Sequence, residues 1–446
     1  MEKLFLKKRL LVFIPVFLFG LVGHGQQRGS VLQLTLRDAI GIALSENPTI
    51  KMADQDVELK KVSRKEAWQS LLPTVDLSGN ISYTIEAATM NIDGNQFKMG
   101  RDKSNSWTGA LQVSLPLFAP SVYRTMNMTR EDIELALEKS RESRNSMVNQ
   151  TTKAYFQLLL AQDSYDVLKK SYDFSVENYN VVKAKFEQGK VSEYDKISAE
   201  VQMRNMKPSV VSAENAVNLA MLQLKVLLGI SDAELQIEIK DNLKNYEADV
   251  AAFDGQMLVS LKENSTLKQL DFNERLLHSS LKVQKASFMP TLALSYQYQY
   301  QSISNADFRL GNYNWSPSST LALSLSVPLY RASNFTKVKS TRIQLEQLTE
   351  NRINTERQLQ MQATSYQDNM EASAEQLTSN KESVAQAEKG RLIAQKRYEI
   401  GKGTILELNS SEVALTQSQL TYNQSIYDYL VAKADLDYLM GKDYHE

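Results

Sequence analysis

Between Ser121 and Gln188 the sequence contains neither glycine nor proline. Within this stretch apolar residues return at every third or fourth position, which is the spacing of one face of an α-helix. A continuous helix of this extent would be about 100 Å long, because each residue adds about 1.5 Å. Such a helix is too long for the core of one compact domain. We therefore expect it to pack lengthwise against other long helices or to cross a wide space.

The long stretch is repeated later in the chain, where residues 331–400 contain a single glycine and again no proline. Both stretches end at a glycine, and Gly189 and Gly401 lie 212 residues apart (401 − 189 = 212). Near Pro73 and Pro290 the offset is 217 (290 − 73 = 217). The same two offsets relate Asn47 to Asn264 and Leu227-Leu228-Gly229 to Leu439-Met440-Gly441. The sequence therefore indicates the duplication of one unit of roughly 200 residues.

Charge and composition exclude several classes of function. The formal net charge is −1, which gives no electrostatic argument for binding nucleic acid. Cysteine is absent, and this removes thiol catalysis, thiolate metal sites and disulfides. The three histidines are scattered, and the sequence has no Gly-rich phosphate loop and no plausible Ser/His/Asp set. We expect neither an enzyme nor a bound metal or cofactor.

Residues 1–25 have the pattern of a secretory signal peptide. Lys3, Lys7, Lys8 and Arg9 precede an apolar run over residues 10–22, and small residues follow it. An apolar run of this length falls short of the roughly 20 residues that a membrane-spanning helix needs. We expect cleavage of this segment rather than a membrane anchor, and no later segment is suited to cross a bilayer as a helix.

From residue 73 onward the apolar period changes to alternation, as in Val75, Leu77 and Ile81. Alternation places apolar side chains on one face of a β-strand. It predicts a hairpin over residues 73–118, with a polar loop from Glu86 to Ser106.

The second half repeats this hairpin over residues 290–330, around a loop at residues 302–318. Each strand is about ten residues long, which is enough to cross a bilayer at a tilt. We expect the apolar face to contact lipid, through Leu292, Leu294, Leu321, Leu323 and Leu325. A soluble antiparallel sheet with one wet face is the alternative.

Four strands are too few to close a membrane barrel, because about eight is the smallest number that does. An open sheet edge in lipid would leave backbone groups unpaired at several kcal/mol each. If the strands face lipid, several chains must share one barrel.

Each long helix is expected to turn at its glycine into a shorter return helix. Residue Pro208 is expected to interrupt the first return helix. The expected segments are the signal peptide (1–25), a first repeat (26–240) with helices 121–188 and 192–228, a second repeat (241–446) with helices 331–400 and 404–440, and a waist insertion (229–255).

The chain resembles the TolC-like outer-membrane efflux proteins over nearly its whole mature length. The resemblance rests on the duplicated order of helix, hairpin, long helix, glycine turn and return helix. It also rests on Leu36 to Ile40, Ala43-Leu44, Asn47-Pro48, residues 186–199 and residues 398–413. The fold it implies is mainly α with a small β part, in which a long antiparallel coiled-coil helical barrel joins a four-strand contribution to a shared transmembrane β-barrel.

By this resemblance the function is that of a homotrimeric, porin-like channel in the outer membrane of a Gram-negative-type bacterium. Three protomers would form a twelve-stranded barrel above a periplasmic helical tunnel. The tunnel would be the exit duct of a tripartite efflux or secretion system, with a periplasmic adaptor (membrane fusion) protein and an inner-membrane pump of RND or ABC type. The loops 86–106 and 302–318 would face the exterior, and both glycine turns would lie at the far periplasmic end.

The tip of the tunnel is the candidate gate. Gly189 and Gly401 are each followed six residues later by a carboxylate, Asp195 and Glu407 (195 − 189 = 6, 407 − 401 = 6). Acids are also common in first helical turns, where the macrodipole favours them. The resemblance implies that Glu407 lines the bore in an acidic ring and that Asp195 accepts a hydrogen bond from Tyr398. The sequence departs from the family at two positions, with Gly403 in place of an Arg latch and Ser410 in place of a second acidic ring.

Two other functions stay open at this point. One is the outer-membrane duct of a type I protein secretion system, because a tunnel rich in Ser, Gln and Asn indicates no particular cargo. The other is a periplasmic coiled-coil adaptor or scaffold, although such a protein would not need four alternating strands with aromatic ends.

Overall fold

The structure is a computed structural model, which describes residues 32–92, 95–100, 102–231, 235, 237–253, 258–304 and 314–444. The expected signal peptide, residues 1–25, lies outside the described residues, as does most of the loop expected at residues 302–318.

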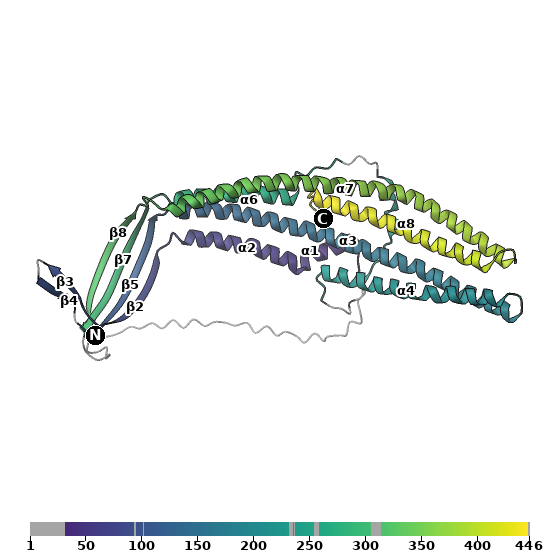
Figure 1. Cartoon of the computed structure of the whole chain (residues 1–446), viewed down its shortest axis with the longest axis horizontal. Helices are drawn as coiled ribbons and strands as arrows, with labels where there is room; N and C mark the ends of the chain where they lie inside the picture. Colours follow the sequence, from purple (N-terminus) through teal and green to yellow (C-terminus); the bar gives the residue numbers. More distant parts are fainter. Residues whose placement is uncertain are drawn as a thin grey trace, which may run out of the picture.

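Two helices of equal length dominate the molecule (Figure 1). They are α3 (Pro120–Glu187) and α7 (Ala332–Glu399), each of 68 residues. Each turns back into a helix of 35 residues, α4 (Glu193–Leu227) after α3 and α8 (Ile405–Leu439) after α7. The predicted long helices and return helices are confirmed.

Shorter helices cover the half of each long helix that its return helix does not reach. They are α1 (Leu36–Glu46), α2 (Pro48–Gln69) and α6 (Ser265–Ala286). Helix α2 packs against α3, whereas α6 packs against both α3 and α7. Asn47 separates α1 from α2, and Pro48 is the first residue of α2, where its missing N–H costs nothing.

At one end of the helices lies a four-stranded antiparallel sheet in the order β2-β5-β7-β8 (Figure 1). Its strands are β2 (Thr74–Thr84), β5 (Ser104–Phe118), β7 (Thr291–Ser304) and β8 (Ser316–Ser326). The two hairpins have the same register, because Leu77 pairs with Leu111 and Leu294 pairs with Leu323. These pairs are related by the repeat offsets (294 − 77 = 217, 323 − 111 = 212).

The prediction of a loop from Glu86 to Ser106 is wrong in part, because this segment contains a second, small hairpin. Its strands are β3 (Ala88–Ile92) and β4 (Asn95–Met99). Met90 pairs with Phe97 and Ala88 with Met99, so apolar side chains share one face of the hairpin. This short alternation was hidden among polar residues. Beyond the hairpin β5 begins at Ser104.

The expected interruption at Pro208 is also wrong, because α4 continues through it. Proline removes one N–H and crowds the carbonyl four residues earlier, here that of Arg204. Pro208 and Arg204 are both exposed, so water can reach the carbonyl that loses its partner.

The segment between the repeats wraps the middle of the helices. Its strand β6 (Ile237–Glu238) pairs with β1 (Leu32–Gln33), and a 3-10 turn η1 (Leu243–Tyr246) and helix α5 (Glu247–Ala251) follow. Glu247 accepts a hydrogen bond of 2.7 Å from Tyr422 and pairs with Lys381. These two contacts attach the segment to α8 and α7. The short helices were not predicted, and the repeat boundary at residue 240 stays a prediction.

The main apolar core lies at mid-length, where α3, α8 and the end of α4 meet the waist segment. A second, smaller core lies at the glycine-turn end. None of the helices in the described part of the chain has the length and hydropathy of a membrane span.

Candidate functional site: the glycine-turn tip

The tip is built by two equivalent turns at the end of the molecule opposite the sheet (Figure 1). Gly189 and Gly401 have φ angles of 70° and 71°, in the left-handed region that glycine adopts without a Cβ clash. In each turn the next residue closes a Schellman-type bond, from Lys190 N to Lys185 O at 2.9 Å and from Lys402 N to Arg397 O at 2.8 Å. The repeat therefore extends to the backbone of the tip.

Asp195 has a structural role at the start of α4. Its carboxylate accepts hydrogen bonds from the Ser192 backbone N at 3.1 Å and from the Ser192 hydroxyl at 2.8 Å. The Ser192 hydroxyl in turn accepts from the Asp195 backbone N at 3.1 Å. This reciprocal arrangement is a capping box, which satisfies helix-end donors.

Tyr398 packs its ring into the small core at the tip, beside Val182 and Ile405. Burial, and secondarily the nearby Asp195 charge, raise the pKa of its hydroxyl. The Nζ of Lys185 lies 5.1 Å from the ring centroid. The expected hydrogen bond to Asp195 is not formed, since no described residue bonds the Tyr398 hydroxyl. The Asp195 carboxylate is engaged by Ser192 instead.

Glu407 lies in the first turn of α8, where its backbone N donates to the Thr404 hydroxyl at 3.2 Å. Its side chain points toward Arg397, with 3.6 Å between Oε2 and Nη1. Both side chains are about half exposed, so the pair contributes little to stability. Arg397 was missed by the sequence reasoning.

Gly403 has a steric reason to lack a side chain. A Cβ at this position would lie 3.0 Å from the Arg397 Cβ and 3.1 Å from the Tyr398 backbone N. An arginine here would require its neighbours in the turn to move by a few tenths of an ångström. The departure from the family pattern is therefore part of the turn geometry.

The structure brings four of the five expected tip residues together. Gly189, Asp195, Tyr398 and Gly401 line one pocket of about 590 Å³, and Glu407 is not among its lining residues. No group of described residues has the composition of a metal site. The Ser192 hydroxyl and the Asp195 carboxylate also line this pocket, where both are held in the capping box of α4.

An ion pair above the tip with a buried carboxylate was also missed. Glu412 of α8 and Arg391 of α7 lie 3.8 Å apart, and the Glu412 side chain is 9% exposed. Arg391 also stacks on Phe174 of α3, 5.0 Å from the ring centroid. Burial raises the pKa of the Glu412 carboxyl, while a hydrogen bond from Ser171 and the charge of Arg391 lower it. A charged residue in a polar helical stretch carries no sequence signal of burial, which explains the omission.

The strand leucines share one face of the sheet, as expected. Leu292 pairs with Leu325 and Leu294 with Leu323. The three leucines of β8 are 64–70% exposed. The opposite face of β7 carries a row of glutamines, in which Gln297 donates to Gln299 at 3.0 Å and Gln299 to Gln301 at 3.1 Å. Contact of the leucine face with lipid stays a prediction.

Comparisons with known proteins agree with this architecture. A family model described as "Outer membrane efflux protein" matches residues 39–230 and 259–442. The alkaline protease secretion protein AprF of Pseudomonas aeruginosa is 23% identical over 93% of this chain and 86% of its own length. The outer membrane protein TolC of Escherichia coli is 21% identical over 98% of this chain and 87% of its own length.

Among solved structures, the CmeC outer membrane channel of Campylobacter jejuni has the same fold. Its TM-score is 0.71 at 18% identity, covering 91% of this chain and 85% of that one. The family match is in two blocks, one in each repeat, and spans most of the sequence. The chain thus belongs to the outer membrane efflux protein family and is a non-enzymatic TolC-like channel of the outer membrane with a helical periplasmic extension.

Proposed function

We propose that three copies of this chain form one channel, which serves as the exit duct for a periplasmic adaptor and an inner-membrane pump. The observation that carries this proposal is the pair of open edges of the sheet. Strands β2 and β8 are paired on one side only in the described residues. In lipid, each unpaired backbone group costs several kcal/mol, so a second copy is needed at each edge.

The pairing of β5 with β7 joins the two repeats and supplies a template for the missing contact. The repeat counterparts of β5 and β7 are β8 and β2. Leu111 of β5 lies opposite Tyr298 of β7. Applying the offsets (111 + 212 = 323, 298 − 217 = 81) places Leu323 of one copy opposite Ile81 of the next.

Cysteine cross-linking tests this arrangement, because the chain has no cysteine of its own. Oxidation of Leu323→Cys/Ile81→Cys in outer membranes should give bands of two and three joined chains. Leu111→Cys/Tyr298→Cys is the matched control, which should close within one chain. Before oxidation, a trimer band that disappears on heating is expected for both pairs. A single-chain product from both pairs, with no heat-sensitive trimer, would contradict the proposal.

The cargo has two candidate classes. An efflux pump of RND type would export small molecules, whereas an ABC-type pump would export protein. The similarity to AprF, a protease secretion protein, favours the second. Deletion of the gene should then remove a protein from the culture medium without raising sensitivity to small toxic compounds. The reverse pattern would support small-molecule efflux.

A further inference from the structure

Each repeat closes the junction between its short helices and its return helix with the same contacts. We name these the first clasp (Glu46, Asn47, Lys51, Leu227, Gly229) and the second clasp (Glu263, Asn264, Lys268, Leu439, Gly441). Asn47 donates to the Leu227 carbonyl at 2.8 Å, and Asn264 donates to the Leu439 carbonyl at 2.7 Å. The lysine of each clasp pairs with its glutamate.

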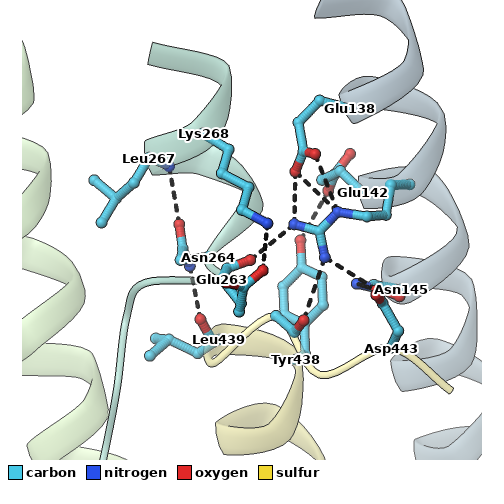
Figure 2. Close-up of polar contacts among 12 residues, drawn as sticks. Glu138, Glu142, Asn145, Glu263, Asn264, Leu267, Lys268, Tyr438, Leu439 and Asp443 are labelled. Carbon is cyan, nitrogen blue, oxygen red and sulfur yellow. Dashed lines mark hydrogen bonds and ion pairs between the residues drawn. The ribbon is translucent and has the colours of Figure 1, made fainter. Parts of the chain in front are cut away.

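The second clasp is covered by a residue from the other repeat. Arg141 of α3 donates to the carbonyl oxygens of Glu263 at 2.8 Å and Gly441 at 3.2 Å. It also pairs with Glu138 and with Asp443, which lie beside the clasp in Figure 2. Carbonyl groups at the helix junction are thereby satisfied.

The part of one chain that the structure describes provides no such cover for the first clasp. Among the described residues, no side chain donates to the carbonyl oxygen of Glu46 or Gly229. The counterpart of α3 is α7, which packs on α6 and α8 without extensive contact to α2 or α4. Figure 1 shows α7 along one long edge of the molecule and α2 with α4 along the opposite edge. Only a second copy can bring an α7 to the first clasp.

The repeat offset identifies the residue that would arrive there. Asn145 of α3 is buried and donates to Asp443 at 3.2 Å beside the second clasp. Its counterpart on α7 is Arg357 (145 + 212 = 357), which is exposed in one chain. The counterpart of Arg141 is Ile353, which has no donor. An arginine one turn further along the helix can extend back over the roughly 5.4 Å of that turn.

A second pair of positions predicts the same placement of α7 from a second copy against the first repeat. Asn149 of α3 donates to Asp435 of α8 at 2.9 Å. The counterparts are Met361 on α7 and Gln223 on α4 (149 + 212 = 361, 435 − 212 = 223). Met361 is 67% exposed, and Gln223 lines a pocket of about 580 Å³. The pocket also contains the exposed side chains of Leu222 and Val226. An unpartnered apolar side chain thus meets an unpartnered apolar pocket.

We propose that the α7 helix of a second copy docks on the first clasp, with Met361 filling the pocket at Leu222 and Val226. Arg357 of that copy covers the carbonyl oxygens of Glu46 and Gly229. The occupant is a second copy of this chain, so the inference rests on the homotrimer proposed above. It adds the register of the helical interface and assigns Arg357 the part that Arg141 plays within one chain.

Cross-linking tests the register. Met361→Cys/Gln223→Cys should join different chains, whereas the counterpart pair Asn149→Cys/Asp435→Cys should close within one chain. Both are compared with the strand pair Leu323→Cys/Ile81→Cys. If the strand pair joins chains but Met361→Cys/Gln223→Cys does not, the helical register is wrong and the trimer stands. If neither pair joins chains, the trimer itself is wrong.

Charge reversal tests Arg357. Arg357→Glu should lower the temperature at which half of the trimer dissociates, whereas Arg357→Lys should lower it less. Arg342→Glu on the same helix is the matched control, because its counterpart Arg130 (342 − 212 = 130) is exposed even though α3 is packed on both sides. Equal dissociation temperatures for Arg357→Glu and Arg342→Glu would overturn the assignment of Arg357.

Discussion

The Asn264 side-chain amide donates to the carbonyl of Leu439 at 2.7 Å, across 175 residues of sequence. Its oxygen accepts from the Leu267 backbone N at 3.1 Å, so one buried side chain starts α6 and holds the end of α8 (Figure 2). Asn47 makes the same two kinds of contact in the first repeat. An aspartate could cap the helix but could not donate to the carbonyl.

We therefore predict that Asn264→Asp destabilises the protein although it preserves the cap. The lost donor and the carboxylate left facing a buried carbonyl should together cost about 1–3 kcal/mol. Thermal unfolding followed by circular dichroism in detergent measures this cost. Asp54→Asn, at an exposed ion pair with Arg144, is the control and should change little. Equal stability of Asn264→Asp and the wild type would show that the bond to Leu439 is dispensable.

The glycines of the first repeat should differ in their tolerance of alanine. Gly229 and Gly189 both have positive φ, at 69° and 70°. A Cβ on Gly229 would lie 2.9 Å from the Glu46 carbonyl oxygen, whereas a Cβ on Gly189 meets open space. Gly189→Ala should cost about 1–2 kcal/mol for the left-handed backbone alone. Gly229→Ala should cost more, so its unfolding temperature should be lower than that of Gly189→Ala. The opposite order would mean that the first clasp opens freely.

The sequence alone predicted the helices and hairpins because their signals are long and local. The long helices are predicted by the absence of Gly and Pro, and the hairpins by the change of apolar period at Pro73. The return helices are predicted by the paired glycine turns. The β3–β4 hairpin was missed because five-residue strands give too short an alternation. The predicted interruption at Pro208 was wrong because the cost of a proline inside a helix depends on whether water reaches the carbonyl that loses its partner. That exposure is a property of the fold and not of the local sequence.

The candidate site was less predictable. Asp195 and Glu407 lie in the first turns of α4 and α8, as their equal spacing from the two glycines implies, but spacing does not determine hydrogen-bond partners. The Asp195 carboxylate accepts hydrogen bonds from Ser192, and the Glu407 carboxylate lies near Arg397. The pairing of the buried Glu412 with Arg391 depends on how α3, α7 and α8 pack together. No local sequence pattern encodes how these three helices pack.

Tyr398→Phe is expected to leave the resting conductance of the channel unchanged. The hydroxyl has no hydrogen-bond partner among the described residues, so its removal breaks no bond and relieves a buried polar group. Tyr398→Ala should instead cost about 3–5 kcal/mol, because the ring packs in the tip core. Single-channel recording in planar bilayers, with thermal unfolding in parallel, separates the two. Higher resting conductance in Tyr398→Phe would mean that the assembled tip contains a latch through this hydroxyl.

Glu407 is expected to form a ring of three carboxylates in the trimer, which should bind multivalent cations. Trivalent cations added on the periplasmic side should block conductance, and Glu407→Gln should relieve the block. Arg397→Gln should strengthen the block, because it removes the positive charge 3.6 Å from the Glu407 carboxylate. Block that is unchanged in Glu407→Gln would show that this side chain does not face the bore.

The packing above the tip is expected to weaken as pH rises from 5 to 7. Burial raises the pKa of the Glu412 carboxyl above its value in the unfolded chain. The folded state therefore holds the proton more tightly, and the free energy of unfolding falls as pH rises from the unfolded pKa through the folded pKa. Hydrogen exchange of the amides at residues 408–416, corrected for intrinsic rates, should show more protection at pH 5 than at pH 7. Glu412→Gln should abolish the difference. Protection that instead increases with pH in the wild type would mean that the ion pair with Arg391 outweighs burial and holds Glu412 ionised.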